Sequence, residues 1–134
     1  MEFKLSEGLY CEKEYIVREE HAASHIGSGS LRVLSTPSMI AFMERTALHC
    51  AEQYLPGDYT TVGTMVNIKH VNPAPVGAEI KVAVRLVSVD GRRLIFEVKA
   101  FWGSILIGEG LHERYIVNTA KFIEKVRSLT SMQQ

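Results

Sequence analysis

One long helical segment constrains the fold of this chain more than any other feature, because most of the remaining sequence alternates as strands do. The segment begins at Thr36, which we interpret as its N-cap, and Pro37 suits the first helical position. It ends near Leu55, where Pro56-Gly57 stops it. At about 100° per residue its apolar side chains form one arc, the predicted buried face: Met39, Ile40, Met43, Ala47, Cys50, Ala51 and Tyr54.

Glu44 breaks the pattern of this helix. It lies between Ile40 and Leu48 on the apolar side, where an ionised carboxylate needs a partner to offset its lost hydration. Glu44 therefore predicts either a functional role or an ion pair, for example with Arg114 or with a second copy of the chain. The predicted solvated side carries the other residues: Phe42, Arg45, Thr46, His49, Glu52 and Gln53.

Alternating apolar residues predict five strands in the rest of the chain. The runs cover residues 9–17, 60–71, 79–89, 94–102 and 105–117. Asp90-Gly91, between the third run and the fourth, is typical of a tight hairpin. After the last run, Asn118 or Thr119 is predicted to cap a short C-terminal helix.

The composition predicts one compact domain over residues 1–134. Lysine plus arginine and aspartate plus glutamate number 15 each, so no net charge attracts nucleic acid or an anionic membrane. No apolar segment approaches the length of a membrane span and the N-terminus has no signal-peptide pattern, which predicts a cytoplasmic protein. Cys11 and Cys50 are too few for a disulfide framework, and in a reducing compartment we expect both to be free thiols.

This order of elements favours an α+β hot-dog fold. In that fold an antiparallel five-stranded sheet wraps around one long central helix, and here a short C-terminal helix is added. One helix and one sheet leave a sheet edge and part of the helix uncovered. A homodimer would cover both surfaces.

His70 is the second ionisable residue that the pattern assigns to the interior. It ends the second alternating run, in which it is predicted to share one face with Val62, Thr64, Val66 and Ile68. Glu44 and His70 are therefore predicted to meet between helix and sheet. A histidine beside a carboxylate is held in one tautomer and stays basic, as general-base catalysis requires.

Thr36 adds a hydroxyl that such a histidine can activate. The helix N-terminus also offers a partial positive charge and backbone N–H groups for an oxyanion, here those of Ser38 and Met39 because Pro37 has none. Structural interpretations remain open beside these: Thr36 as only a cap, His70 as a hydrogen-bonded core histidine, and Glu44 as a structural ion-pair partner.

His21 and His25 are spaced to share one face of a helix, as half of a metal site would be. Zinc hydrolases with this spacing have a glutamate directly after the first histidine, where this chain has Ala22. We therefore predict no metal and no cofactor.

Several segments resemble the fluoroacetyl-coenzyme A thioesterase family of hot-dog proteins over about residues 33–126. They are Ser35-Thr36-Pro37-Ser38-Met39 with Glu44, Gly63-Thr64 with His70, residues 89–94, and Gly108-Glu109-Gly110-Leu111-His112-Glu113-Arg114. The resemblance implies a homodimeric acyl-coenzyme A thioesterase that hydrolyses a short or small acyl-CoA, with active sites at the dimer interface.

The resemblance also implies roles for individual residues. Thr36, Glu44 and His70 match the family's catalytic threonine, glutamate and histidine, and Gly63 matches an active-site glycine. Pro37 stands where the family has a glycine, and residues 27–30 offer no bulky aromatic to close over a very small acyl group. Fluoroacetyl specificity is therefore not predicted.

Cations near the pocket mouth are candidates to meet the phosphates of coenzyme A. They are Lys69, Arg92, Arg93 and Arg114, of which Arg114 is the first choice for either a phosphate contact or a structural one. Two other functions remain open. One is a non-catalytic hot-dog module that binds acyl-CoA or another small apolar ligand. The other is a hot-dog dehydratase. The absence of an aspartate shortly before His70 argues against it.

Overall fold

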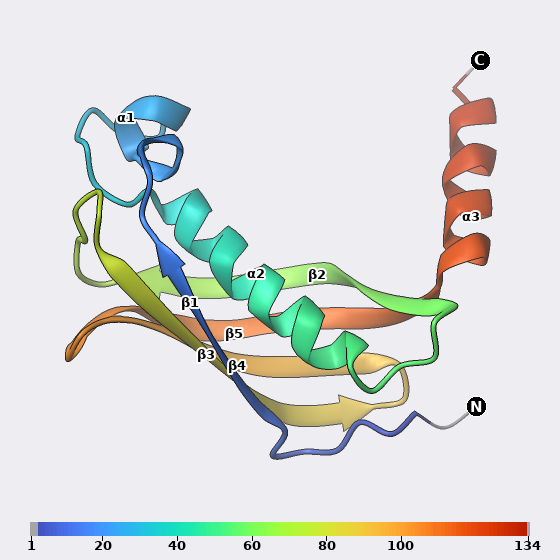
Figure 1. Cartoon of the computed structure of the whole chain (residues 1–134). Helices are drawn as coiled ribbons and strands as arrows, with labels where there is room; N and C mark the ends of the chain where they lie inside the picture. The colour runs from blue at the N-terminus through green and yellow to red at the C-terminus, as the bar shows by residue number, and fades with distance from the viewer. Residues whose placement is uncertain (1–2, 134) are drawn as a thin grey trace.

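A five-stranded antiparallel sheet wraps around one long helix in the computed structural model, which describes residues 3–133 (Figure 1). The strands are β1 (Tyr10–Ile16), β2 (Tyr59–His70), β3 (Glu79–Asp90), β4 (Arg93–Trp102) and β5 (Ile105–Asn118). They are ordered β1-β3-β4-β5-β2, and every neighbouring pair is antiparallel. The hot-dog layout predicted from the sequence is confirmed, and β1 and β2 are its two edges.

The helices are α2 (Thr36–Glu52), which lies in the concave side of the sheet, and α3 (Thr119–Ser131), which extends away from the end of β5 (Figure 1). Two short helices, η1 (Glu19–His21) and α1 (Ala23–Ile26), lie between β1 and α2. None of the helices in residues 3–133 has both the length and the apolar character to cross a membrane.

Most local predictions are confirmed to within two residues, and the hairpin is one of them. Asp90 pairs with Arg93 across a two-residue loop, in which Gly91 adopts φ +60°. The loop residues are Gly91 and Arg92, and the left-handed conformation of the first one favours glycine, as in two-residue hairpins that begin with glycine. Asn118 is the cap of α3, because its side chain accepts a hydrogen bond from the N–H of Lys121 at 3.1 Å.

The buried face of α2 differs from the predicted one. The helix ends at Glu52 and not near Leu55, and Tyr54, predicted to be buried, is exposed. Phe42 and Thr46, which the pattern placed on the solvated side, are both buried. The reason is β1, which packs against that side. The ring of Tyr15 stacks on Phe42 with 4.5 Å between centroids, and its hydroxyl is hydrogen-bonded to Thr46 Oγ1 at 2.9 Å.

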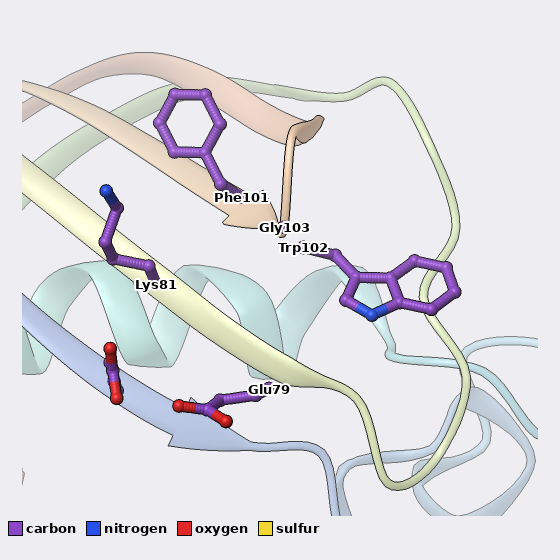
Figure 2. A pocket seen from close by; sticks show the side chains of 6 residues that line it. Glu79, Lys81, Phe101, Trp102 and Gly103 are labelled. Atoms are coloured by element: carbon purple, nitrogen blue, oxygen red, sulfur yellow. The ribbon is translucent and has the colours of Figure 1, made fainter.

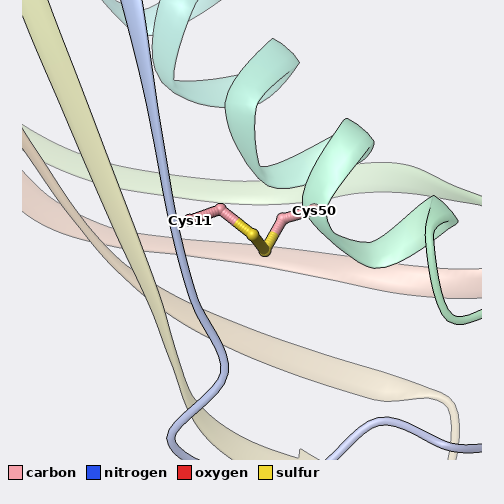
Figure 3. The surroundings of a disulfide bond; sticks show 2 residues. All are labelled: Cys11 and Cys50. Atoms are coloured by element: carbon pink, nitrogen blue, oxygen red, sulfur yellow. A yellow bond between two sulfur atoms is a disulfide. The ribbon is translucent and has the colours of Figure 1, made fainter.

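The prediction of two free thiols is wrong, because Cys11 of β1 and Cys50 of α2 form a disulfide (Figure 3). Their Cα atoms lie 5.9 Å apart although 39 residues separate them in the sequence. Counting cysteines excluded a framework of several bridges, but it could not exclude one bridge between two elements that the fold brings together. Cys50 is buried, as predicted.

A β-bulge in β2 changes which residues face the helix. The register with β5 shifts between Gly63 and Met65. A bulge inserts one extra residue, so side chains after it point to the opposite face from the one that strict alternation predicts. The single predicted face is therefore wrong in its first half: Val62 and Thr64 point away from α2, whereas Val66, Ile68 and His70 point toward it.

Candidate functional site

The N-terminus of α2 leaves the hydroxyl of Thr36 free. The N-cap is Ser35, whose side chain accepts a hydrogen bond from the N–H of Ser38 at 3.1 Å, and Thr36 is the first helical residue. The prediction that Thr36 is the cap is therefore wrong by one residue. Because Ser35 satisfies the helix end, Thr36 can use its hydroxyl elsewhere.

Thr36 uses that hydroxyl to contact His70. Its Oγ1 lies 2.7 Å from Nδ1 of His70, which ends β2. The contact joins the start of the central helix to the end of an edge strand, 34 residues later in the chain. Burial lowers the pKa of His70, with a smaller opposing contribution from the backbone of Asn72. The imidazole is therefore neutral at pH 7 and can accept the proton of Thr36.

The second ring nitrogen of His70 has no partner. Among residues 3–133, Nε2 of His70 is the one buried side-chain nitrogen or oxygen without a hydrogen bond. An unpaired buried polar group costs about 1–3 kcal/mol, so such groups are rare unless a ligand, water or another chain supplies the partner. When Thr36 donates to Nδ1, Nε2 carries the proton and needs an acceptor.

Glu44 does not meet His70 within the chain. Glu44 lies eight residues after Thr36, which is about 12 Å along the helix. Its partner is Arg114, with 3.9 Å between Oε2 of Glu44 and Nη1 of Arg114. Its side chain is 43% exposed, whereas Arg114 is buried. The predicted ion pair with Arg114 is thus present, while no ion pair or hydrogen bond between Glu44 and His70 is found in residues 3–133.

Arg114 belongs to a buried polar cluster on β5 and β2. It donates from Nε to Thr61 Oγ1 at 2.7 Å and from Nη2 to the Thr61 carbonyl at 3.0 Å. Its Nη1 lies 3.0 Å from Nε2 of His112, and Nδ1 of His112 lies 2.9 Å from the carbonyl oxygen of Met65. With every guanidinium nitrogen occupied in the interior, Arg114 is not free to bind a surface phosphate.

Gly63 lies directly beneath Glu44. A Cβ atom at this position would lie 2.9 Å from Glu44 Oε2, 3.3 Å from His112 Cε1 and 3.4 Å from Arg114 Nη1. Only glycine allows the carboxylate to approach the strand this closely without displacing one of these groups. The structure therefore gathers Gly63, Glu44 and Arg114 in one place and Thr36 with His70 in another.

The backbone donors predicted for an oxyanion are already bonded. The N–H of Ser38 donates to the side chain of Ser35. The N–H of Met39 donates to the backbone carbonyl of Ser35 at 3.0 Å. Met39 is also buried. The N–H of Thr36 itself has no hydrogen bond among the described residues, so it is the donor of this turn that remains available.

The predicted phosphate-binding cations do not converge. Arg93 forms an ion pair with Glu113, and Arg92 lies over the ring of Tyr59 at the opposite end of β2 from Lys69. His21, considered for a metal site, packs its ring on Phe42 and accepts a hydrogen bond from the N–H of Arg18. No group of three potential metal ligands is found within residues 3–133.

A surface pocket of about 430 Å³ lies apart from these residues (Figure 2). It is lined by Glu14, Glu79, Lys81, Phe101, Trp102 and Gly103. A hydrogen bond with Glu79 raises the pKa of Glu14. Neither Thr36 nor His70 borders this pocket, so it is not the candidate active site.

Sequence reasoning assigned no role to Ser35, Thr61 or His112, although Ser35 and His112 lie in segments that resemble the family. Ser35 precedes Thr36-Pro37, and both Ser and Thr are good caps, so the pattern could not choose between them. His112 does carry a signal, because it lies two residues before Arg114 on the inward face of a strand. A buried histidine and a buried arginine at this spacing indicate a polar cluster.

Comparisons with known proteins place this geometry in context. Residues 17–120 match the family described as fluoroacetyl-CoA-specific thioesterase (FlK). The chain is 36% identical over 98 residues to the fluoroacetyl-CoA thioesterase of Streptantibioticus cattleyicolor, an alignment that covers 73% of this chain and 70% of that enzyme.

Two solved structures resemble the whole fold. A mutant of FlK in complex with acetyl-CoA has a TM-score of 0.88 at 29% identity, covering 94% of this chain and 99% of that one. A thioesterase superfamily member from Thermus thermophilus has a TM-score of 0.88 at 25% identity, covering 96% of this chain and 95% of that one. The similarity therefore includes α2, β2 and β5, which carry the candidate site.

Proposed function

Because the chain belongs to the fluoroacetyl-CoA-specific thioesterase family, we propose that it hydrolyses the thioester of a short or small acyl-CoA to the free acid and coenzyme A. The observation that carries the proposal is the 2.7 Å contact between Thr36 Oγ1 and His70 Nδ1 at the N-terminus of α2. A neutral histidine held on a hydroxyl is the arrangement that activates either that hydroxyl or a water molecule.

Thr36 can act in two ways in this arrangement. As a nucleophile, its oxygen bonds to the thioester carbonyl carbon while His70 takes its proton. The C–S bond then breaks, the coenzyme A sulfur receives that proton, and water hydrolyses the acyl-threonine. As a positioning group, Thr36 instead holds the carbonyl while His70 removes a proton from the attacking water. In both routes the free N–H of Thr36 is a candidate donor to the oxyanion.

Thiol release from a panel of acyl-CoA esters tests the proposal. We expect hydrolysis by the wild type and a loss of more than about 100-fold in kcat/KM in His70→Ala, which removes the base. His49→Gln, on the exposed side of α2, is the matched control and should retain activity. Absence of turnover across the panel would refute the proposal, and binding without turnover would favour the non-catalytic module.

Mass spectrometry separates the two roles of Thr36. If Thr36 is the nucleophile, rapid quenching should trap a protein heavier by one acyl group, and Thr36→Ser should keep that adduct. If Thr36 only positions the substrate, no adduct forms and Thr36→Ala should retain a measurable part of kcat. The acetyl-CoA complex of the FlK mutant makes acetyl-CoA a suitable first substrate.

We also propose a homodimer with active sites at its interface. β2 is an open edge of the sheet with Met65 and Val66 exposed on it, and such edges are normally covered. Antiparallel pairing of two β2 edges would bring Glu44 of a second copy toward His70, whose Nε2 needs an acceptor. The half-exposed carboxylate of Glu44, which lies beside Gly63 of β2, is the candidate acceptor.

Light scattering after gel filtration tests the dimer, with an expected mass of about twice 15.0 kDa. Val66→Glu places a charge at the centre of the edge and should shift the protein to monomers with lower kcat/KM. An active wild-type monomer would contradict the proposed interface. The cytoplasmic location remains a prediction.

A further inference from the structure

His112 is a buried ionisable residue that the proposed reaction does not use. It lies on β5, is completely buried, and faces α2 together with Arg114. The base in the proposed reaction is His70, so His112 is available for another task. Both of its ring nitrogens have partners, which means that the residue is held in one orientation.

The hydrogen bonds of His112 define its protonation. An arginine side chain only donates, so Nε2 of His112 must accept from Nη1 of Arg114 at 3.0 Å. The proton must then lie on Nδ1, from which it is donated to the Met65 carbonyl at 2.9 Å. Burial, the largest effect, lowers the pKa of His112. The hydrogen bond to the Met65 carbonyl opposes it, the charge of Arg114 lowers the pKa further, and Glu44 and Glu113 raise it by smaller amounts. The ring is neutral as a consequence.

The acceptor for His112 lies at the bulge in β2. The register shift between Gly63 and Met65 lies opposite Glu113 and Arg114. Because β2 is an edge strand, not all of its carbonyls are used in the ladder. The carbonyl of Met65 lies 2.9 Å from Nδ1 of His112, and this contact fixes the tautomer.

His112 is also the contact that orients one arm of Arg114. Thr61 holds Nε and Nη2 of the guanidinium, and His112 holds Nη1, the nitrogen that faces Glu44 across 3.9 Å. Without an acceptor at Nε2, Nη1 would be a buried donor with only the distant carboxylate to satisfy it. Arg114 would then turn toward Glu44 and pull the carboxylate away from its place above Gly63.

We propose that His112, as its neutral Nδ1–H tautomer, is a positioning residue that fixes Arg114 and thereby sets the place of the Glu44 carboxylate for the reaction. The inference rests on the proposed function to the extent that Glu44 takes part in thioester hydrolysis. His112 itself touches neither Glu44 nor the Thr36–His70 pair through a hydrogen bond, so it acts through Arg114.

The first test needs no substrate. Nitrogen-15 NMR of the histidine rings distinguishes the two neutral tautomers and the imidazolium, and His112→Gln assigns the signal. We expect an Nδ1–H tautomer with a slowly exchanging proton at pH 7. An Nε2–H tautomer, or an imidazolium at pH 7, would overturn the proposal because Nε2 could not then accept from Arg114.

The second test compares two amides at position 112. In His112→Gln the side-chain oxygen reaches the place of Nε2 and can still accept from Arg114. In His112→Asn the shorter amide can bond only to the Met65 carbonyl. We expect His112→Asn to lose between tenfold and 100-fold in kcat with KM within about twofold, and His112→Gln to retain most of kcat. Equal activity of the two variants at matched Tm would overturn the proposal.

A double-mutant cycle with Arg114 completes the test. If His112 acts through Arg114, His112→Asn should change kcat by less than twofold in the Arg114→Ala background. Full additivity would show that His112 acts by another route and would overturn the proposal. A wild type that hydrolyses no acyl-CoA would instead refute the proposed function, and the positioning role with it, while the tautomer measurement still reports on the contacts.

Discussion

Reduction of the disulfide between Cys11 and Cys50 should destabilise the protein by about 4 kcal/mol. The bridge closes a loop of 39 residues. The chain-entropy relation for a loop of that length gives about 13 cal/mol/K, or about 3.9 kcal/mol at 25 °C. For 134 residues the entropy of unfolding is about 0.28 kcal/mol/K, so Tm should fall by about 14 °C.

Thermal unfolding followed by circular dichroism, with and without a phosphine reductant, measures this loss. The double variant Cys11→Ser with Cys50→Ala is the control, and its Tm should not respond to the reductant. Activity at 25 °C should persist after reduction, because Cys50 lies about 21 Å along α2 from Thr36. A change in Tm of less than about 3 °C in the wild type, equivalent to about 1 kcal/mol, would refute the loop-closure reasoning.

Four further predictions test the site and the core. Burial lowers the pKa of His70, and the neutral form of this residue is the base. A pH profile of kcat/KM should therefore be constant above pH 7 and fall only below pH 6.5, the usual pKa of histidine. A midpoint of this profile above pH 7 would contradict the assignment. Stability should likewise decline as pH falls below 6.5, where the unfolded chain binds the proton more readily. Gly63→Ala should lower kcat/KM at least tenfold by displacing Glu44, whereas Gly57→Ala, which meets nothing within 4 Å, should leave it unchanged in the same assay. Thr46→Val removes a buried hydroxyl from two hydrogen bonds and should cost about 1–3 kcal/mol in urea unfolding; no change in stability would mean that this side of α2 is solvated after all.

Local chemistry explains which parts of the fold were predictable. The Asp90-Gly91 turn depends on two adjacent residues, and the strand lengths depend on alternation over ten or so positions, so the sequence contains that information directly. The buried face of α2 was predictable only on the side that meets the main sheet. Phe42 and Thr46 are buried by β1, and nothing within the helix indicates that an edge strand crosses it there.

The candidate site was predictable by residue type but only partly by contact: Arg114 and Thr36 were among the partners considered, whereas the expected contact between Glu44 and His70 does not form within the described chain. Glu44 and His70 each broke an apolar pattern, which marked them correctly as unusual. Their partners, Arg114 and Thr36, are distant in the sequence, and pairing them requires the register of β2 on β5 and the position of α2 on the sheet. The cap illustrates the same limit on a smaller scale, because Ser35 and Thr36 have nearly equal capping preferences.

The bulge in β2 connects the failed strand prediction to the proposed chemistry. Gly63 and His70 are seven residues apart, and in a strand with a period of two residues they would lie on opposite faces. Glu44 approaches Gly63 from α2, and Thr36 at the start of α2 contacts His70, so both residues face the helix. One extra residue between them is therefore a geometric requirement of a site that uses both. Met65, which ends the same register shift, supplies the carbonyl that His112 contacts, so the bulge that alternation could not predict also lies beside the His112–Arg114 pair.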